Sequence, residues 1–160
     1  MTGKVFVLAV CLAGAALAAD VKPAPEIGLK DASGKTVMLE QYRGKVVLLD
    51  FWATWCTGCK EEMPWFVEYQ KKFGTKKFAV IGVAMDDEGW KVVAPFLKSH
   101  KQFRYRMVVG DQATADRFGW GSMLPDSFLI DQRGNLVEAY HGKVDRAATE
   151  ARIAALLGLR

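Results

Sequence analysis

The fold is decided by the stretch Val46-Val47-Leu48-Leu49-Asp50-Phe51-Trp52-Ala53-Thr54-Trp55-Cys56-Thr57-Gly58-Cys59. From Val46 to Trp52 the residues are apolar at consecutive positions, apart from Asp50, which indicates a strand that is covered on both faces. From Cys59 to about Phe73 the apolar side chains recur at helical spacing, so we expect a helix there, with Pro64 inside it. Two cysteines separated by two residues therefore lie at a strand-to-helix turn.

This turn gives the two cysteines different surroundings. Cys56 precedes the helix, where free backbone N–H groups and the positive end of the helix dipole stabilise a thiolate. A thiolate stabilised in this way is a usable nucleophile near neutral pH. Cys59 lies within the first helical turn, so we expect Cys56 to be the exposed cysteine and Cys59 the buried one. The alternative is a buried structural pair without redox chemistry.

The remaining composition excludes several other classes of site. Besides Cys56 and Cys59 the chain has one more cysteine, Cys11, and two histidines, His100 and His141, which do not cluster. A structural zinc site needs four ligands, so we expect no metal and no cofactor. The net charge is only +4 at pH 7 and the basic residues are scattered, which argues against a nucleic-acid partner.

The N-terminus has the pattern of a secretory signal peptide. A short basic start with Lys4 precedes an apolar stretch from Val5 to Ala15, and Ala16-Leu17-Ala18 supplies small residues for a signal peptidase. We expect residues 1–18 to be a signal peptide cleaved before Ala19, and residues 19–160 to form one periplasmic or otherwise extracytoplasmic domain. The alternative is an uncleaved membrane anchor, although the apolar run is shorter than the roughly 20 residues that span a bilayer.

The rest of the chain alternates between strand and helix patterns. Residues 27–29 and 36–39 flank a turn at 31–35 and predict an N-terminal β-hairpin. Further strands are predicted at 78–85, 105–109, 127–131 and 136–141, and helices at 93–100 and 114–118 and around Ile153 before Gly158. This order predicts an α/β sandwich with a central mixed sheet flanked by helices.

The segment Phe51 to Lys60, together with Pro64 and with Leu124-Pro125 before a predicted strand, resembles the thioredoxin superfamily. The opening hairpin and the long segment between Cys59 and Pro125 are similar to its extracytoplasmic TlpA/ResA-like branch. The resemblance implies that Cys56 is the nucleophile and that Cys59 resolves the mixed disulfide. It also implies that Pro125 is a cis-proline beside the dithiol, with the Leu124 backbone turned toward an extended peptide substrate.

The same resemblance assigns roles to two acids. Asp50 matches the buried carboxylate of thioredoxins, and Glu62 matches the active-site glutamate of ResA-like proteins. The alternatives are a strand-end Asp50 turned to water and a solvated Glu62 in the first turn of the helix. Trp55 is expected at the rim around Cys56, or in simple packing.

Two positions depart from the pattern of the branch. Gly58 stands where the branch usually has proline, and Asp126 stands where Thr or Ser commonly follows the cis-proline. These departures bear on redox potential and on the choice of partner.

The Cys-x-x-Cys pair predicts a thiol–disulfide oxidoreductase, an enzyme. The resemblance to the TlpA/ResA-like branch further implies that it reduces disulfides of selected proteins such as apocytochromes or copper-site cysteines. A membrane thiol electron donor is the expected reductant, and the enzyme is expected to be a monomer. One alternative is an oxidant or isomerase using the same dithiol. Another is a Cu(I) chaperone in which His141 joins the two cysteines. A peroxidase is disfavoured because the chain has no Pro-x-x-x-Thr-x-x-Cys pattern.

Overall fold

Strand β3 (Val46–Trp52) is at the centre of a seven-stranded mixed sheet in the computed structural model, which describes residues 22–121 and 123–159. The other strands are β1 (Gly28–Lys30), β2 (Thr36–Met38), β4 (Phe78–Ala84), β5 (Arg106–Val109), β6 (Asp126–Ile130) and β7 (Leu136–His141). Their order across the sheet is β2-β1-β5-β4-β3-β6-β7. The helices are α1 (Thr57–Phe73), α2 (Trp90–Ser99), α3 (Gln112–Arg117) and α4 (Arg146–Leu156), with a short 3-10 helix η1 (Leu39–Tyr42).

The directions of the strands follow from their connections. α1 links β3 to β4 and α2 links β4 to β5, so these three strands run parallel. β6 and β7 form an antiparallel hairpin, and β6 pairs antiparallel with β3. The N-terminal hairpin of β1 and β2 extends the other edge through β5. The predicted mixed sheet, its flanking helices and the N-terminal hairpin are therefore confirmed.

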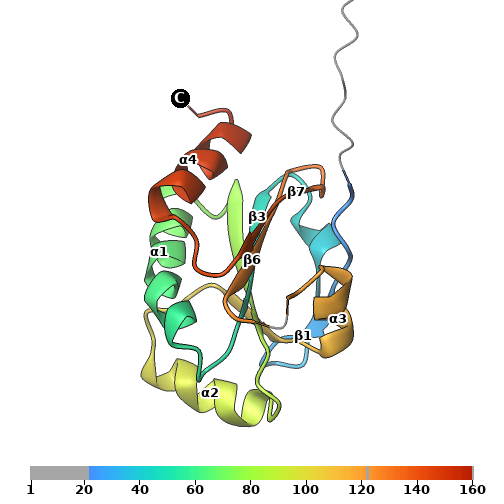
Figure 1. Cartoon of the computed structure of the whole chain (residues 1–160), viewed down its shortest axis with the longest axis vertical. Helices are drawn as coiled ribbons and strands as arrows, with labels where there is room; N and C mark the ends of the chain where they lie inside the picture. Colours follow the sequence, from blue (N-terminus) through green and yellow to red (C-terminus); the bar gives the residue numbers. More distant parts are fainter. Residues whose placement is uncertain (1–21, 122, 160) are drawn as a thin grey trace, which may run out of the picture.

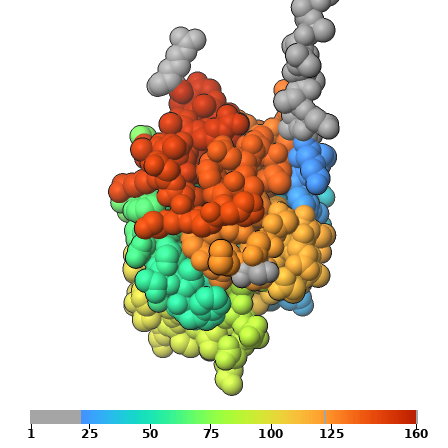
Figure 2. Space-filling model, viewed as in Figure 1, coloured from blue at the N-terminus to red at the C-terminus, as the bar shows by residue number. Residues whose placement is uncertain are grey.

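The two faces of β3 belong to two different cores. Val46, Leu48 and Trp52 pack with α1, α2 and α4, whereas Val47, Leu49 and Phe51 pack with the hairpin, η1 and α3. Figure 1 shows α1 and α4 on one side of the sheet and α3 on the other. Because side chains alternate along a strand, Asp50 faces the first core, the one that contains Cys56 and Cys59. The space-filling view shows α4 and β7, in red and orange, forming much of one face (Figure 2).

Some expectations lie beyond the described residues, and one element was not expected. The proposed signal peptide, residues 1–18 with Cys11, is outside the described part of the chain. The sequence pattern did not predict the helix η1, whose first residue, Leu39, was expected at the end of the hairpin. Among the described residues, no helix is both long and apolar enough to cross a membrane.

Candidate active site

The two cysteines lie where β3 gives way to α1. Cys56 is the N-cap of α1, and its sulfur accepts the backbone N–H of Cys59 at 3.1 Å. Cys56 and Cys59 are joined by a disulfide, with their Cα atoms 5.4 Å apart. The expected placement, with Cys56 before the helix and Cys59 in its first turn, is confirmed.

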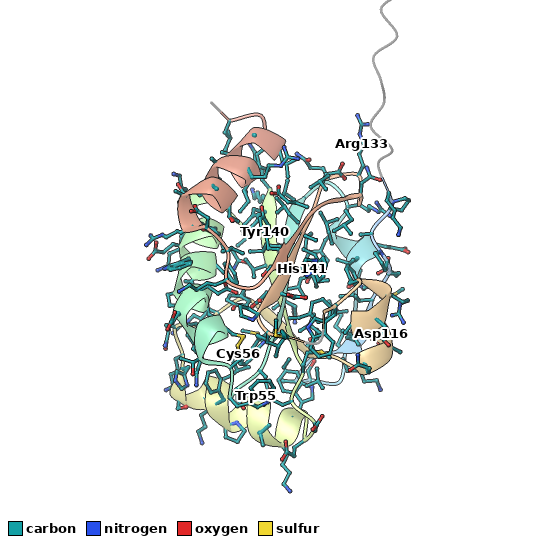
Figure 3. The ribbon with its side chains drawn as sticks, viewed as in Figure 1. Trp55, Cys56, Asp116, Arg133, Tyr140 and His141 are labelled. Atoms are coloured by element: carbon teal, nitrogen blue, oxygen red, sulfur yellow. A yellow bond between two sulfur atoms is a disulfide. The ribbon has the colours of Figure 1, made fainter. Side chains whose placement is uncertain are left out.

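The exposure of the two cysteines differs less than expected. Cys59 is fully buried, as predicted, but only 5% of Cys56 is exposed. The prediction of an exposed Cys56 is therefore wrong for the disulfide form, because its sulfur turns inward to Cys59 while the flanking Trp55 and Thr57 face solvent. Trp55 is 68% exposed, so it stands at the rim and is not a packing residue. Figure 3 shows Trp55 and Cys56 near each other in the lower half of the view, above α2.

Pro125 lies beside the Cys-x-x-Cys loop, and Leu124 packs against the core that contains both cysteines. The peptide bond between them is cis, and Pro125 directly precedes β6, whose residue Asp126 pairs with Phe51 of β3. A Cβ atom on Gly58 would lie 3.4 Å from Cδ of Pro125. The pairing of β6 with β3 therefore brings a segment 66 residues after Cys59 into contact with the Cys-x-x-Cys loop.

Asp50 is fully buried on the face of the sheet that packs against α1 and the two cysteines. Its Oδ1 accepts a hydrogen bond from Ser127 Oγ at 3.4 Å, whereas Oδ2 has no partner among the described residues. Burial raises the pKa of Asp50 well above its usual range, and the negative charge of Glu62 raises this pKa further. The alternative of a carboxylate turned to water is therefore excluded.

Glu62 is also fully buried, one turn after Cys59 on α1. Its Oε2 accepts the backbone N–H of Val144 at 3.0 Å, and Oε1 has no partner among the described residues. Burial raises the pKa of Glu62 to about 7, although the Val144 N–H and Lys143 both oppose the rise. The neighbouring Glu61 is exposed and pairs with Lys143 at 2.8 Å, so the solvated alternative describes Glu61 and not Glu62.

Two further acids near the dithiol were not among the predicted site residues. Asp86 accepts hydrogen bonds from the backbone N–H and the hydroxyl of Thr54, and thereby holds the turn before Cys56. Asp126 is buried and lies 3.1 Å from Nδ1 of the exposed His141. The sequence signal for Asp86 was its position two residues after β4, whose C-terminal end lies beside that of β3. For Asp126 the sequence signal was only that it replaces the Thr or Ser that commonly follows the cis-proline.

The site consists of two cysteines at a helix N-terminus, a cis-proline beside them and two buried carboxyls on the same face of the sheet. Comparisons with known proteins give the family. The sequence model of the AhpC/TSA family matches residues 21–139. This chain belongs to the AhpC/TSA family. The chain is 36% identical over 132 residues to the thiol-disulfide oxidoreductase ResA of Bacillus cereus, covering 81% of this chain and 73% of that protein.

Solved structures extend the similarity to the whole domain. A crystal structure from Chlorobium tepidum, assigned as the thiol:disulfide interchange protein DsbE, has a TM-score of 0.79 at 32% identity and covers 86% of this chain and 97% of its own. A second Chlorobium tepidum protein, a thiol:disulfide interchange protein of the thioredoxin family, has a TM-score of 0.76 at 27% identity, with coverages of 88% and 99%. This AhpC/TSA-family member is thus a thiol–disulfide oxidoreductase with a thioredoxin-like fold, as its sequence predicted.

Proposed function

We propose that this oxidoreductase works outside the cytoplasm and reduces disulfides of selected proteins, such as apocytochromes or copper-site cysteines. Support comes from the signal-peptide pattern of residues 1–18, from the ResA and DsbE names of its relatives, and from the buried acids. The domain that acts is residues 19–160, a monomer that a membrane thiol donor returns to the dithiol state.

In the proposed reaction Cys56 and Cys59 act in turn. The Cys56 thiolate attacks one sulfur of a substrate disulfide, the substrate S–S bond breaks, and a mixed disulfide forms. Cys59 then loses its proton to Asp50 or Glu62, and its thiolate attacks the Cys56 sulfur. The second substrate sulfur leaves as a thiolate, so the substrate gains two electrons and Cys56–Cys59 becomes the disulfide.

The proposal that the protein acts as a reductant rests mainly on Glu62, which is buried one turn from Cys59. A carboxylate near thiols disfavours the thiolate forms and so limits indiscriminate reaction with any disulfide that the enzyme meets. In an oxidising compartment such restraint suits a reductant that serves chosen partners. Leu124, Pro125 and Trp55 are proposed to form the surface on which those partners lie.

The catalytic assignment is tested by Cys56→Ser and Cys59→Ser. Insulin reduction is expected to be lost in both variants, while Cys59→Ser alone accumulates a mixed disulfide through Cys56. Trapping that mixed disulfide in cells and identifying the captured protein names the substrate. Insulin reduction that persists in Cys56→Ser contradicts the assignment.

The direction is tested by the redox state of the dithiol in cells. Cells are quenched with acid and their free thiols are labelled, with and without deletion of membrane thiol donors. We expect a largely reduced dithiol that becomes oxidised when the donor is deleted. If Cys56 and Cys59 are almost wholly disulfide-bonded in both strains, the protein is not a reductant, and an oxidant or isomerase is favoured.

A Cu(I) chaperone is the alternative from a different class. It requires His141 as a third ligand, yet His141 Nδ1 lies 3.1 Å from a carboxylate oxygen of Asp126. Among the described residues no group of three His, Cys, Asp or Glu side chains is arranged to hold a metal. Cu(I) titration of the reduced protein and of His141→Ala separates the two functions, since a chaperone loses affinity in the variant.

A further inference from the structure

A hollow of about 470 Å³ lies directly beside the Cys-x-x-Cys turn. Its lining residues come from the C-terminal ends of the parallel strands β3, β4 and β5 and from the segments just after them. The carboxyl ends of parallel strands are where ligands usually bind in α/β sheets. Trp55, the residue before Cys56, lines this hollow, so an occupant of the hollow is a close neighbour of the nucleophilic cysteine.

Two tryptophans give the hollow apolar walls. Trp55 comes from the turn before α1, and Trp120 comes from the loop after α3. Trp120 Nε1 donates to the backbone carbonyl of Met123 at 3.0 Å, two residues before the cis-proline Pro125. Trp55 and Met123, 68% and 77% exposed, are the most exposed large apolar side chains among the described residues. Tryptophan and methionine are enriched in protein–protein interfaces, so this side of the active site has the character of a partner-binding surface.

Three aspartates, Asp86, Asp87 and Asp111, line the same hollow, and no lysine or arginine of the described residues lines it. None of the three takes part in an ion pair within the described part of the chain. The hydrogen bond from the backbone N–H of Thr114 lowers the pKa of Asp111, which keeps that carboxylate charged at neutral pH. Since the whole chain has a net charge of +4, the hollow is a local negative region on a positive molecule.

Contacts within the protein explain two of these acids without neutralising them. Asp86 accepts hydrogen bonds from Thr54, and Asp111 is the N-cap of α3, whereas Asp87 is exposed. One cation lies near this turn: Lys60 Nζ donates to the Thr54 carbonyl at 3.2 Å, but Lys60 does not line the hollow. The negative charge inside the hollow is therefore open to a cation from another molecule.

We infer that this hollow selects the substrate, by receiving a lysine or arginine side chain that lies within about three residues of the cysteine that Cys56 attacks. The cationic head gains from the carboxylates and from the faces of the two indoles, and its apolar stem packs on Trp55. An extended chain covers about 3.3 Å per residue, which sets the limit of three residues. The inference deepens the proposed function, and it rests on the attack of Cys56 on a protein disulfide.

The test measures how the charge of a peptide changes its reaction with Cys56. Reduced Cys59→Ser is mixed with short peptides whose single cysteine is joined by a disulfide to 2-thiopyridine, a neutral coloured leaving group. The Cys56 thiolate attacks the peptide sulfur, a protein–peptide disulfide forms, and pyridine-2-thiolate leaves with the electron pair. The peptides differ only in having Lys, Gln or Glu two residues from the cysteine, and each rate is divided by the rate with 2-mercaptoethanol.

The Lys peptide is expected to react roughly three- to tenfold faster than the Gln peptide, and the Glu peptide more slowly than both. This preference should weaken at high salt, because exposed charges are screened. The net positive charge of the protein would by itself favour the Glu peptide, so a preference for Lys has a local origin.

Two double variants, both made in the Cys59→Ser protein, locate that origin. Asp87→Asn with Asp111→Asn removes two charges from the hollow, and asparagine remains a good N-cap for α3. The three peptides are then expected to react within about twofold of one another. Glu40→Gln with Glu68→Gln is the matched control, because it removes two charges at exposed positions that do not line the hollow. The control should keep the preference for Lys.

Equal rates for the three peptides in Cys59→Ser overturn the inference, and so does a preference for Glu. An equal loss of preference in the two double variants also overturns it, because net charge then explains the effect. Failure of the proposed function has different signatures. If Cys56 does not attack disulfides, no peptide releases pyridine-2-thiolate, and if the protein is an oxidant, the dithiol is oxidised in cells while the preference for Lys persists.

Discussion

At the scale of single residues, the contrast between Glu61 and Glu62 shows how burial gives adjacent identical side chains different properties. Glu61 is exposed and pairs with Lys143, whereas Glu62 is fully buried and its pKa is raised to about 7. An unfolded glutamate titrates near 4.5. Between these pH values the folded protein therefore holds more protons than the unfolded protein, and its stability falls as pH rises.

The variant Glu62→Gln is expected to remove this part of the pH dependence. Gln keeps an oxygen that can accept the Val144 N–H, and it does not ionise. Relative to the original protein, the free energy of unfolding of Glu62→Gln should rise by on the order of 2–3 kcal/mol between pH 5 and pH 8, because each pH unit between the unfolded and folded pKa values contributes about 1.4 kcal/mol. Denaturant unfolding of the oxidised proteins measures it.

The matched control is Glu61→Gln, which changes the same chemical group at the adjacent exposed position. Its unfolding free energy should follow the original protein across the whole pH range, apart from a small constant offset. An equal pH response in the two variants would contradict the assignment of the titration to Glu62.

The two cysteines are also expected to differ in reactivity at the residue scale. Cys56 caps α1 next to solvent-facing Trp55 and Thr57, whereas Cys59 is fully buried. In reduced protein, Cys59→Ser, which retains Cys56, should therefore be alkylated at least roughly tenfold faster at pH 6 than Cys56→Ser. Iodoacetamide labelling followed by mass spectrometry checks this, and faster labelling of Cys56→Ser would reverse the roles.

At the scale of elements, the first turn of α1 sets how readily the dithiol closes. Gly58 is the second residue of α1, a position that tolerates proline because its N–H has no partner within the helix. Replacing glycine by proline at a compatible position contributes about 0.4–1 kcal/mol by restricting the open chain. The variant Gly58→Pro is therefore expected to have a reduction potential lower by on the order of 10–20 mV.

Equilibration of the protein with thiol buffers of defined potential measures this change. Gly58→Ala is the control, because its Cβ would lie at ordinary contact distance, 3.4 Å, from Pro125 and restricts the chain less. Its potential should fall between those of the glycine and proline forms. A higher potential in Gly58→Pro than in the original protein would refute the entropic argument.

The elements themselves were largely predictable, because each has a local signal. Short segments of sequence contain the apolar run of β3, the helical spacing of apolar residues in α1 and the turn residues between β6 and β7. The helix η1 was missed because four residues carry too little periodicity to identify it. The order of the strands across the sheet follows from general rules for βαβ units.

The site was predictable only in part, because burial depends on residues far away in the chain. Glu62 is held by Val144, which lies 82 residues later, and no local pattern distinguishes it from Glu61. Cys56 and Cys59 could be predicted because they form a compact Cys-x-x-Cys motif. Pro125 could be predicted because it matches the family pattern of a proline before a strand.

At the scale of the whole molecule, export of the chain leads to a direct prediction. If residues 1–18 are a signal peptide, protein expressed with its own N-terminus in a bacterial host should be recovered from the periplasm beginning at Ala19. Intact-mass measurement checks this, and Ala18→Leu should retain the leader because a bulky residue blocks cleavage. Recovery of the original protein in the membrane fraction with residues 1–18 attached would support the uncleaved anchor.

The attachment of the N-terminal segment to the sheet also has a practical consequence. The backbone N–H of Ala24 donates to Gly134 of the β6–β7 turn, and Lys22 accepts a backbone hydrogen bond from Leu136 at the start of β7. Gly44, just before β3, donates to Gln132 of the same turn. Cys56 follows the other end of β3, a seven-residue strand about 20 Å long, and Figure 3 shows Arg133 of that turn near the top and Cys56 well below it. An electrode or bead coupled ahead of Lys22 would therefore lie away from the Cys-x-x-Cys turn and its exposed Trp55, which makes the domain suitable for an immobilised redox sensor.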